Sequence, residues 1–330
     1  MRYTNLGRSP LKVSKLCFGA MSFGYVTDEQ EAERLVRHAL DLGINFFDTA
    51  AAYTDGKSEQ YLGKALKGVR DQVVISTKFG CRVENGDGIN DRNSSRYHIM
   101  QAVETSLKRM GTDHIDLYII HMAHPGMDLE ETLTAMDDLV HQGKVRYLGV
   151  SNFPAWLLCK SLWMSDINRL SSFRCLQSVY NLVERGIEVE TLPLCDAEGL
   201  GVMAYRGLCR GLLAGQYLDV GNSDGNAKLD RWAAQLRPSL DTLKGFAESR
   251  GKQMAQAAIA WTTSHPTVTC AIVGPTKTRE LDELAEAVEW QLDPVDRQML
   301  ADAFPTAMTE YDLGVHSAWR TSYDLLMGGR

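Results

Sequence analysis

The sequence predicts a parallel α/β fold built from eight strand–helix units. Short apolar runs recur at roughly 30-residue spacing, as expected for parallel strands joined by crossover helices. Runs such as Val73-Val74-Ile75 are apolar without alternation, which is typical of strands that are buried on both faces. A chain of 330 residues is long enough for one large α/β barrel, and no low-complexity linker divides it. We therefore expect a single domain over residues 1–330.

The strands can be assigned in order from the N-terminus. Gly7-Arg8-Ser9-Pro10 separates two short segments of β character, 2–6 and 11–16, which predicts a hairpin before the main fold. The eight expected strands of the main fold are 16–20, 45–49, 73–78, 116–121, 145–151, 176–181, 201–206 and 269–274.

The helices between them carry their own start and stop signals. Asp128-x-x-Glu131 is a capping pair before an apolar stripe that Gly143 ends, and Thr27-x-x-Gln30 begins a similar stretch that runs to Leu42-Gly43. Ser95 begins another, which ends at Met110-Gly111. Two helices over about 238–250 and 252–264 are expected before the eighth strand, and 293–303 is expected to form a terminal helix.

Two connections are longer than a strand–helix unit requires, 79–94 and 207–237, and both should lie over the C-terminal ends of the strands. The first is rich in Gly, Asn and Asp, which predicts a mobile loop that shapes a substrate mouth. The second contains 221–226, the stretch of the chain with the strongest tendency to disorder.

Composition narrows the class of function. A net charge of −7 speaks against a nucleic-acid footprint. No apolar run approaches the ~20 residues of a membrane span, and the N-terminus has no signal-peptide pattern, so a cytoplasmic protein is expected. The seven cysteines are scattered without a C-x-x-C pair, which indicates neither a disulfide framework nor a metal site. The oligomeric state stays open.

Polar residues stand where apolar runs end. Asp48, Lys78 and His121 each end a predicted strand, and Tyr53 follows shortly after one. Because the C-terminal ends of parallel strands are where such folds place their chemistry, we expect these four residues to share one site. Taken singly, each has a structural interpretation as a turn, cap or packing residue, and the prediction depends on the set.

Five motifs stand in order on these strands: Asn45-Phe46-Phe47-Asp48-Thr49-Ala50 with Tyr53, Ser76-Thr77-Lys78, Asp116-Leu117-Tyr118-Ile119-Ile120-His121, Gly149-Val150-Ser151-Asn152 and Gly211-Leu212-Leu213-Ala214-Gly215. Together they resemble the aldo-keto reductases, from the hairpin to about residue 304. The resemblance implies a (β/α)8 TIM barrel with an N-terminal β-hairpin and a C-terminal helical extension. It also implies binding of NADP(H) without a Rossmann fold, and hydride transfer between nicotinamide and a carbonyl.

By this resemblance, Tyr53 is the catalytic acid/base, and Asp48, Lys78 and His121 complete a tetrad. The chemistry agrees, because carbonyl reduction needs a general acid, and a tyrosine with a pKa near ~10 donates poorly until a cation lowers that pKa. Lys78 is the expected cation, and Asp48 would keep it charged. His121 could hydrogen-bond the carbonyl oxygen and orient it.

The resemblance also implies where a cofactor would bind. Ser151, Asn152 and Gln177 would hold the nicotinamide carboxamide, and Tyr205 would stack on the ring; the structural interpretation is a polar turn beside a core aromatic residue. The other expected cofactor-binding residues lie at strand ends or in the segments that follow; they are Gly19, Ala20, Met21, Asp48, Arg206, Leu208, Arg210, Gly211, Gly274, Thr276, Lys277, Glu280 and Glu283.

The cofactor prediction is NADP(H), with NAD as the second choice. Lys277 and the backbone at the start of the helix after the eighth strand suit a 2′-phosphate. Three departures from the family pattern weaken the match. Glu280 stands where relatives often have Arg or Gln, Arg206-Gly207 replaces a common Ser-Pro, and Leu284 replaces a common Asn.

The predicted function is NADP-dependent reduction of an aldehyde, ketone or keto-sugar to the alcohol, with a small-molecule carbonyl substrate as the only expected partner. A sugar or alcohol dehydrogenase that runs in the oxidative direction is the first alternative. Two alternatives come from other classes: a Schiff-base aldolase that uses Lys78, and a cofactor-binding regulatory subunit with little turnover. His124 has no assigned role and is expected to be a surface loop residue.

Overall fold

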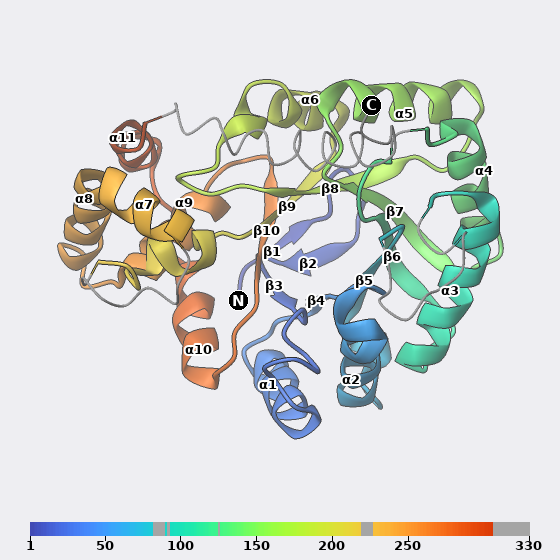
Figure 1. Ribbon diagram of the computed structural model, residues 1–330, viewed down its shortest axis with the longest axis horizontal. Helices are drawn as coiled ribbons and strands as arrows, with labels where there is room; N and C mark the ends of the chain where they lie inside the picture. Colours follow the sequence, from blue (N-terminus) through green and yellow to red (C-terminus); the bar gives the residue numbers. More distant parts are fainter. Residues whose placement is uncertain (82–89, 91–92, 125, 219–226, 306–330) are drawn as a thin grey trace.

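Eight parallel strands close into a barrel in the order β10-β3-β4-β5-β6-β7-β8-β9 (Figure 1). The computed structural model describes residues 1–81, 90, 93–124, 126–218 and 227–305. The barrel strands are β3 (Leu16–Gly19), β4 (Phe46–Asp48), β5 (Val74–Phe79), β6 (Ile115–Ile120), β7 (Val145–Ser151), β8 (Phe173–Val179), β9 (Gly201–Tyr205) and β10 (Val268–Val273). The predicted fold class and all eight predicted strands are confirmed; β8 begins before the predicted start at 176.

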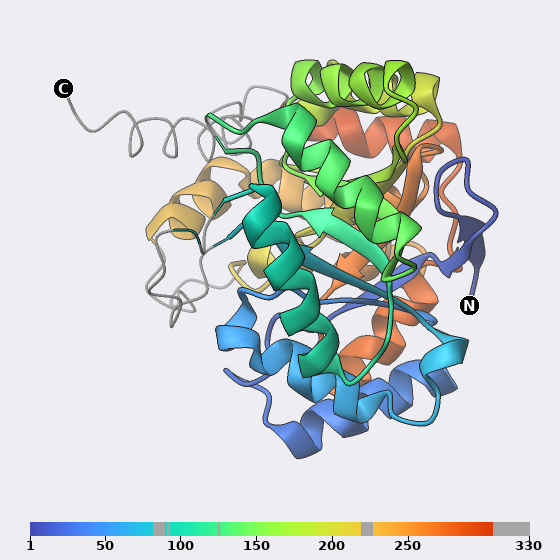
Figure 2. The same ribbon diagram turned by 90° about the vertical axis from the view of Figure 1, so that its right-hand side faces the viewer.

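Helices connect consecutive strands and surround the barrel (Figures 1 and 2). They are α1 (Glu29–Asp41), α2 (Lys57–Ala65), α3 (Arg96–Met110), α4 (Leu129–His141), α5 (Ala155–Ile167), α6 (Thr191–Glu198), α7 (Ala227–Gln235), α8 (Arg237–Glu248), α9 (Met254–Thr263), α10 (Thr278–Ala287) and α11 (Pro294–Ala303). The predicted pair before β10 corresponds to α8 and α9, and the predicted terminal helix to α11.

Side-chain alternation along the strands builds two cores. Outward-facing residues such as Phe47 and Ile75 pack against the helices. Inward-facing residues such as Phe46 and Val74 fill the barrel itself. Because successive residues of a strand point to opposite faces, the residues two and four positions after these inward ones also point into the barrel. Asp48 and Lys78 are therefore directed to its interior.

The predicted hairpin forms from β1 (Tyr3–Asn5) and β2 (Lys12–Ser14), which pair antiparallel. It lies at one end of the barrel (Figure 2). Leu6 and Val13 are fully buried and join the inward-facing core, and the backbone of Arg8 donates to the carbonyl of Gly199, which precedes β9. The hairpin thus covers the end where the strands begin, and leaves the opposite end for a site.

Helix capping follows the prediction in part. Asp128 caps α4 and Ser95 caps α3, each through its side-chain oxygen. For α1 the capping residue is Asp28 rather than Thr27, because Thr27 is buried in the preceding loop and its hydroxyl donates to Ser22. The Glu131 carboxylate accepts from the backbone of Arg96 instead of closing a reciprocal pair with Asp128.

The two long connections are only partly described. Most of the predicted loop 79–94, namely 82–89 and 91–92, lies outside the described residues, as does 221–226. The second connection contains a helix that the sequence did not predict, α7, whose Leu229 and Trp232 are buried. In the described part of the chain, no helix is long and apolar enough to cross a membrane.

Candidate active site

Three of the four predicted catalytic residues meet at the buried ammonium group of Lys78. The Lys78 side chain is fully buried, and its Nζ donates to Asp48 Oδ2 at 2.6 Å and to the Thr49 carbonyl at 2.7 Å. The Tyr53 hydroxyl lies 3.4 Å from the same nitrogen. All three hydrogens of an ammonium group therefore have an acceptor. The arrangement brings together residues from β4, β5 and the segment after β4.

Asp48 holds two further donors besides the lysine. Its Oδ1 accepts from the Ser76 hydroxyl at 2.6 Å and from Gln177 Nε2 at 2.9 Å. Ser76 precedes Lys78 by two positions on β5, so both side chains face the barrel interior. These bonds hold the carboxylate in one orientation and stabilise its charge at a position where only about 3% of the residue is exposed.

Tyr53 is held by an unusual backbone. It begins the short 3₁₀ segment η1 (Tyr53–Gly56), in which Thr54 and Asp55 have φ of 47° and 55°. Left-handed backbone is costly for a β-branched residue, so the surroundings must enforce it. Arg109 of α3 does so from outside: its guanidinium packs where a side chain on Gly56 would lie, and it contacts the carbonyl of Ala51 at 3.4 Å.

Electrostatics at Tyr53 differ from the prediction. Burial raises the pKa of its hydroxyl above the ordinary value, and the Lys78 ammonium opposes this rise without cancelling it. Lys78 does act in the expected direction, but the net pKa is raised rather than lowered. Burial by itself would lower the pKa of Lys78; the Asp48 carboxylate and Tyr53 outweigh burial, and the net pKa of Lys78 is raised. The lysine is thus charged and the tyrosine protonated at neutral pH.

His121 completes the predicted set. Its ring lies edge-on to the Tyr53 ring, with the centroids 5.8 Å apart. Burial, the charge of Lys78 and the proximity of His124 lower the pKa of His121 to about 3, so its imidazole is neutral at physiological pH. Its Nδ1 is buried and has no hydrogen-bond partner among the described residues. A neutral imidazole of this kind can give one hydrogen bond to a substrate oxygen.

His124 lies in a loop, as expected, but it is half-buried and not a surface residue exposed to solvent. It packs against Gly80, and its Nε2 is buried without a hydrogen-bond partner in the described part of the chain. Burial lowers the pKa of His124, so a second neutral imidazole stands near His121.

The residues expected at the nicotinamide join the same network. Asn152 lies in the left-handed region with φ of 58° and donates to the His121 carbonyl at 3.3 Å and to the Ser151 hydroxyl at 3.0 Å. The Tyr205 hydroxyl donates to Asn152 Oδ1 at 2.8 Å. Ser151 therefore keeps its own hydrogen to donate, which fits a carboxamide oxygen. Gln177 is turned to Asp48 through its amide nitrogen.

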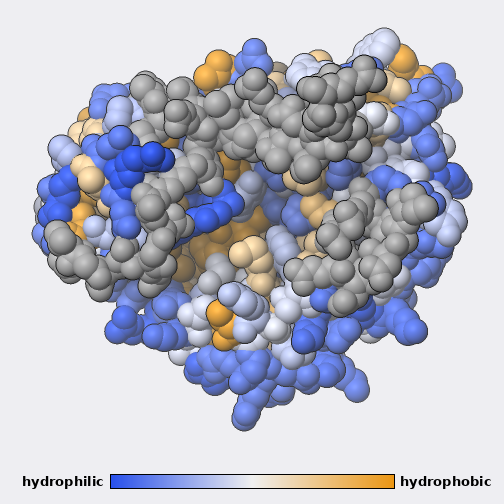
Figure 3. Space-filling model, viewed as in Figure 1, coloured by the Kyte–Doolittle hydropathy of each residue, from blue (hydrophilic) through white to orange (hydrophobic). Residues whose placement is uncertain are grey.

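Other expected cofactor residues surround this network without belonging to it. Gly274, after β10, lies against the carbonyl of Gly19, the last residue of β3, and the backbone of Ala20 donates to the Asp48 carbonyl at 2.8 Å. Met21 is 66% exposed. The face of the molecule seen in Figure 3 is hollowed, and hydrophobic residues form part of the surface inside the hollow.

The segment after β9 makes a tight turn. Its 3₁₀ segment η4 (Cys209–Ala214) follows Leu208 and contains left-handed Arg210 and Gly211, with φ of 56° and 89°. The Arg206 guanidinium lies 5.6 Å from the centre of the Tyr205 ring. Two arginines beside such a turn suit a pyrophosphate, although Arg206 also approaches the ring expected to stack on nicotinamide.

The start of α10 already holds an anion of the chain's own. Glu280 Oε2 accepts from the backbone nitrogens of Thr276 at 2.8 Å and Lys277 at 3.2 Å, and from the Thr276 hydroxyl at 3.3 Å. Glu283 faces Arg279 at 3.3 Å. Glu280 therefore points at the donors that were expected to bind a 2′-phosphate.

Known proteins resemble this chain over nearly its whole length. The model of the aldo/keto reductase family matches residues 15–303, which span the barrel from β3 to α11. The chain belongs to the aldo/keto reductase family. It is 39% identical over 314 residues to the uncharacterized oxidoreductase YrpG of Bacillus subtilis, covering 92% of this chain and 96% of that protein.

Two further relatives of this aldo/keto reductase carry more specific names. The versiconal hemiacetal acetate reductase of Aspergillus parasiticus is 34% identical to this chain, and the aligned region covers 92% of this chain and 97% of that protein. A probable voltage-gated potassium channel subunit beta of Oryza sativa subsp. japonica is 37% identical, and the aligned region covers 88% of this chain and 92% of that protein.

Sequence reasoning missed several residues that position the site of this aldo/keto reductase. Ser76 and Thr49 bind the central charges. Gln177 was expected at the nicotinamide carboxamide, and its amide nitrogen instead donates to Asp48 and orients it. Ser76 could have been found, since it shares its strand face with Lys78. Arg109 carried no signal, because the contact between α3 and η1 depends on how the helices pack.

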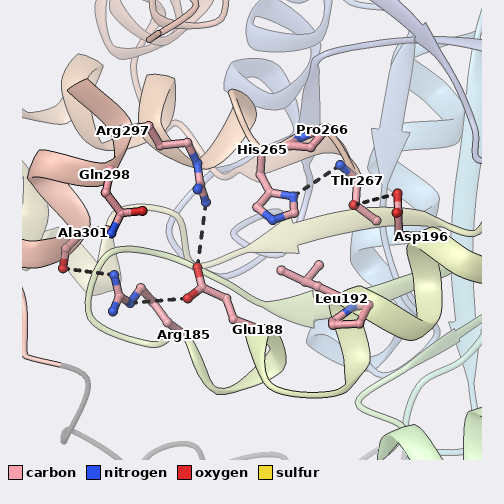
Figure 4. A pocket seen from close by; sticks show the side chains of 11 residues that line it. Arg185, Glu188, Leu192, Asp196, His265, Pro266, Thr267, Arg297, Gln298 and Ala301 are labelled. Atoms are coloured by element: carbon pink, nitrogen blue, oxygen red, sulfur yellow. Dashed lines mark hydrogen bonds and ion pairs between the residues drawn. The ribbon is translucent and has the colours of Figure 1, made fainter. Parts of the chain in front are cut away.

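A cavity of this aldo/keto reductase lies outside the barrel, between α6 and α11 (Figure 4). It measures about 480 Å³ and is lined by Arg185, Glu188, Leu192, Pro193, Asp196, His265, Pro266, Thr267, Arg297, Gln298 and Ala301. Glu188 lies 3.7 Å from the Arg185 guanidinium and 3.8 Å from that of Arg297. Both cations are thus paired within the wall. Arg185 also donates to the Ala301 carbonyl at 3.0 Å, so the wall fastens α11 to the barrel.

Proposed function

We propose that this aldo/keto reductase reduces an aldehyde, ketone or keto-sugar to the alcohol, with a nicotinamide dinucleotide as hydride donor and Tyr53 as proton donor. The observation that carries the proposal is the meeting of Tyr53, Asp48 and His121 around the buried ammonium of Lys78. Within the nicotinamide class, Lys277 favours NADP(H) and Glu280 opposes it.

Each residue has a defined part in the proposed reaction. The bound nicotinamide would supply hydride to the carbonyl carbon. Tyr53 gives its hydroxyl proton to the carbonyl oxygen, and neutral His121 hydrogen-bonds the same oxygen and orients it. Lys78 stabilises the negative charge that remains on the Tyr53 oxygen, and Asp48 keeps Lys78 in place and charged. The Tyr205–Asn152–Ser151 group would hold the nicotinamide end of the cofactor.

The protonation states favour reduction over the oxidative alternative. Burial raises the pKa of Tyr53, so the hydroxyl carries its proton at neutral pH, which is the form that reduction requires, and the Lys78 ammonium offsets part of the resulting loss of acidity. Oxidation of an alcohol needs the opposite form, a deprotonated tyrosine that accepts a proton. Higher pH would therefore favour oxidation, and neutral or lower pH would favour reduction.

The aldolase alternative loses support from the same network. A Schiff base requires a neutral, nucleophilic amine, which proteins obtain by lowering the lysine pKa. The pKa of Lys78 is raised instead, and its three donors are directed to Asp48, Thr49 and Tyr53. A substrate carbonyl would have to break a buried ion pair before it could react.

The test is Tyr53→Phe against the wild type, with aldehydes, ketones and keto-sugars and with both reduced cofactors, followed by loss of nicotinamide absorbance. We expect kcat to fall at least ~100-fold, with cofactor affinity nearly unchanged, because only the proton-donating hydroxyl is removed. Tyr3→Phe is a matched control, since the hydroxyl of Tyr3 in the hairpin donates to the carbonyl of Gly43, just after α1, at the end of the barrel opposite the site. Retention of most of kcat in Tyr53→Phe would refute the role of Tyr53, and no turnover of any carbonyl by the wild type would refute the reductase proposal.

A regulatory subunit with little turnover is the second candidate. Similarity to the rice protein named as a probable potassium channel subunit beta supports it. The two candidates differ in turnover, because a cofactor-binding subunit would bind the dinucleotide tightly and oxidise it slowly with every carbonyl.

A further inference from the structure

The start of α10 lies at the seam where the barrel closes. β10 pairs with β3, and Gly274, just after β10, lies against the carbonyl of Gly19, the last residue of β3. Pro275 is buried, whereas Thr276 and Lys277 are exposed. The two exposed residues therefore present their backbone nitrogens beside the strand ends where the proposed cofactor would bind.

An anionic group already occupies these nitrogens. One oxygen of the half-buried Glu280 side chain accepts three hydrogen bonds, from the Thr276 nitrogen at 2.8 Å, the Lys277 nitrogen at 3.2 Å and the Thr276 hydroxyl at 3.3 Å. The positive end of the helix dipole adds to the attraction for a carboxylate at this position. The Glu280 carboxylate thus takes the place at the start of α10 that a 2′-phosphate of the cofactor would otherwise take.

The positive charges around this helix end are balanced by carboxylates, so no unpaired arginine among the described residues near it is left to bind a phosphate. Arg34, which reaches Thr278 from α1, is bound to Glu31 at 2.8 Å, and Arg279 is paired with Glu283. Lys277 has no ion pair among the described residues, but Glu280 offsets its charge locally. A phosphate dianion would have to displace the Glu280 carboxylate and then remain beside it, against like-charge repulsion.

We infer that Glu280 makes this aldo/keto reductase selective for NAD(H) over NADP(H), by occupying the donors at the start of α10. The inference rests on the proposed function, since it assumes that a nicotinamide dinucleotide binds at the strand ends. The unphosphorylated ribose fits the same carboxylate, because a 2′-hydroxyl can donate a hydrogen bond to it, whereas a 2′-phosphate cannot. The residues present at this position therefore fit NAD and do not fit the extra phosphate of NADP.

The test is isothermal titration of the substrate-free protein with NADH and with NADPH, which measures binding without turnover. We expect the wild type to bind NADH at least ~10-fold more tightly than NADPH. Glu280→Gln removes the charge but keeps an oxygen that can accept from the backbone, and Glu280→Ala vacates the donors. In both variants the ratio of the two dissociation constants should move towards NADPH by roughly 10- to 100-fold.

Asp282→Asn is the matched control. It removes one negative charge from the same helix, where Asp282 pairs with His38 at 2.6 Å and does not contact the helix start. Its ratio of dissociation constants should equal that of the wild type, because a screened surface charge contributes little.

The outcomes separate the inference from the function on which it rests. A wild type that binds NADPH as tightly as NADH, or more tightly, overturns the inference and leaves the reductase proposal intact. A preference for NADH that persists unchanged in both Glu280 variants also overturns it. Failure to bind either dinucleotide would defeat the proposed function itself.

Discussion

Replacement of Lys78 by methionine should separate the structural from the catalytic effect of the buried charges. The change removes an ammonium group that donates to Asp48 at 2.6 Å and to the Thr49 carbonyl at 2.7 Å, in a position with no solvent exposure. Methionine is similar in length and apolar. The Asp48 carboxylate would keep the donors Ser76 and Gln177 but lose its counter-charge.

The expected loss of stability follows from this burial. Breaking a buried ion pair by removing one partner costs about 3–5 kcal/mol, because the other charge stays buried and uncompensated. Asp48→Asn on its own should destabilise for the same reason. The double variant Lys78→Met/Asp48→Asn buries no net charge, so its loss should be smaller than the sum of the two single losses by about 1–3 kcal/mol.

Across these variants, kcat should not change in parallel with the free energy of unfolding. Without the ammonium, the negative charge on the Tyr53 oxygen after proton transfer has no stabilising cation, so kcat should fall at least ~100-fold in Lys78→Met and should stay low in the double variant. Asp48→Asn should be milder, since the lysine remains. Urea unfolding measures the free energies, and nicotinamide oxidation with one aldehyde measures kcat. An undiminished rate in Lys78→Met, or strictly additive stability losses, would refute the charge relationship.

Two further predictions concern pH and packing. Because the pKa of His121 is lowered to about 3 and that of Tyr53 is raised, neither group should titrate between pH 5 and 8. kcat/KM for reduction should therefore be flat over that range and fall only as Tyr53 loses its proton above its usual pKa of ~10; a limb near ~6.5 that disappears in His121→Asn would contradict this. Gly63→Ala should destabilise the fold by about 1–3 kcal/mol or more, because its new Cβ would lie 2.2 Å from the carbonyl oxygen of Met110. Gly245→Ala should stabilise the fold by about 0.5–1 kcal/mol, because Gly245 is an exposed helical residue whose new Cβ would have no neighbouring atom within 4 Å. Urea unfolding measures both changes. Midpoints that moved in the same direction in the two variants would show that the close contact at Gly63 is not the cause.

The strands were predictable because their signal is local. Continuous apolar runs such as that ending at Lys78, separated by stretches with helical capping signals, are features of neighbouring residues. α7 was missed because it follows a Gly- and Asn-rich stretch and is stabilised by burial of Trp232, which only packing reveals.

The grouping of Asp48, Lys78, Tyr53 and His121 was also predictable, for a topological reason. Parallel strands all end at the same edge, so residues at their ends must be near one another whatever the details of packing. Family resemblance then supplied roles for them, which the distances around Lys78 support and which the proposed variants test.

The sequence by itself determined the order of the strands, the end of the barrel that carries polar residues and the identity of those residues. Only the tertiary structure decided which way the polar groups turn and how their charges balance. Gln177 faces Asp48, and Glu280 turns back onto the start of its own helix. The pKa of Tyr53 rises because burial outweighs Lys78. Side-chain direction and pKa depend on neighbours from elements distant in sequence, through packing and desolvation, and a linear pattern contains neither.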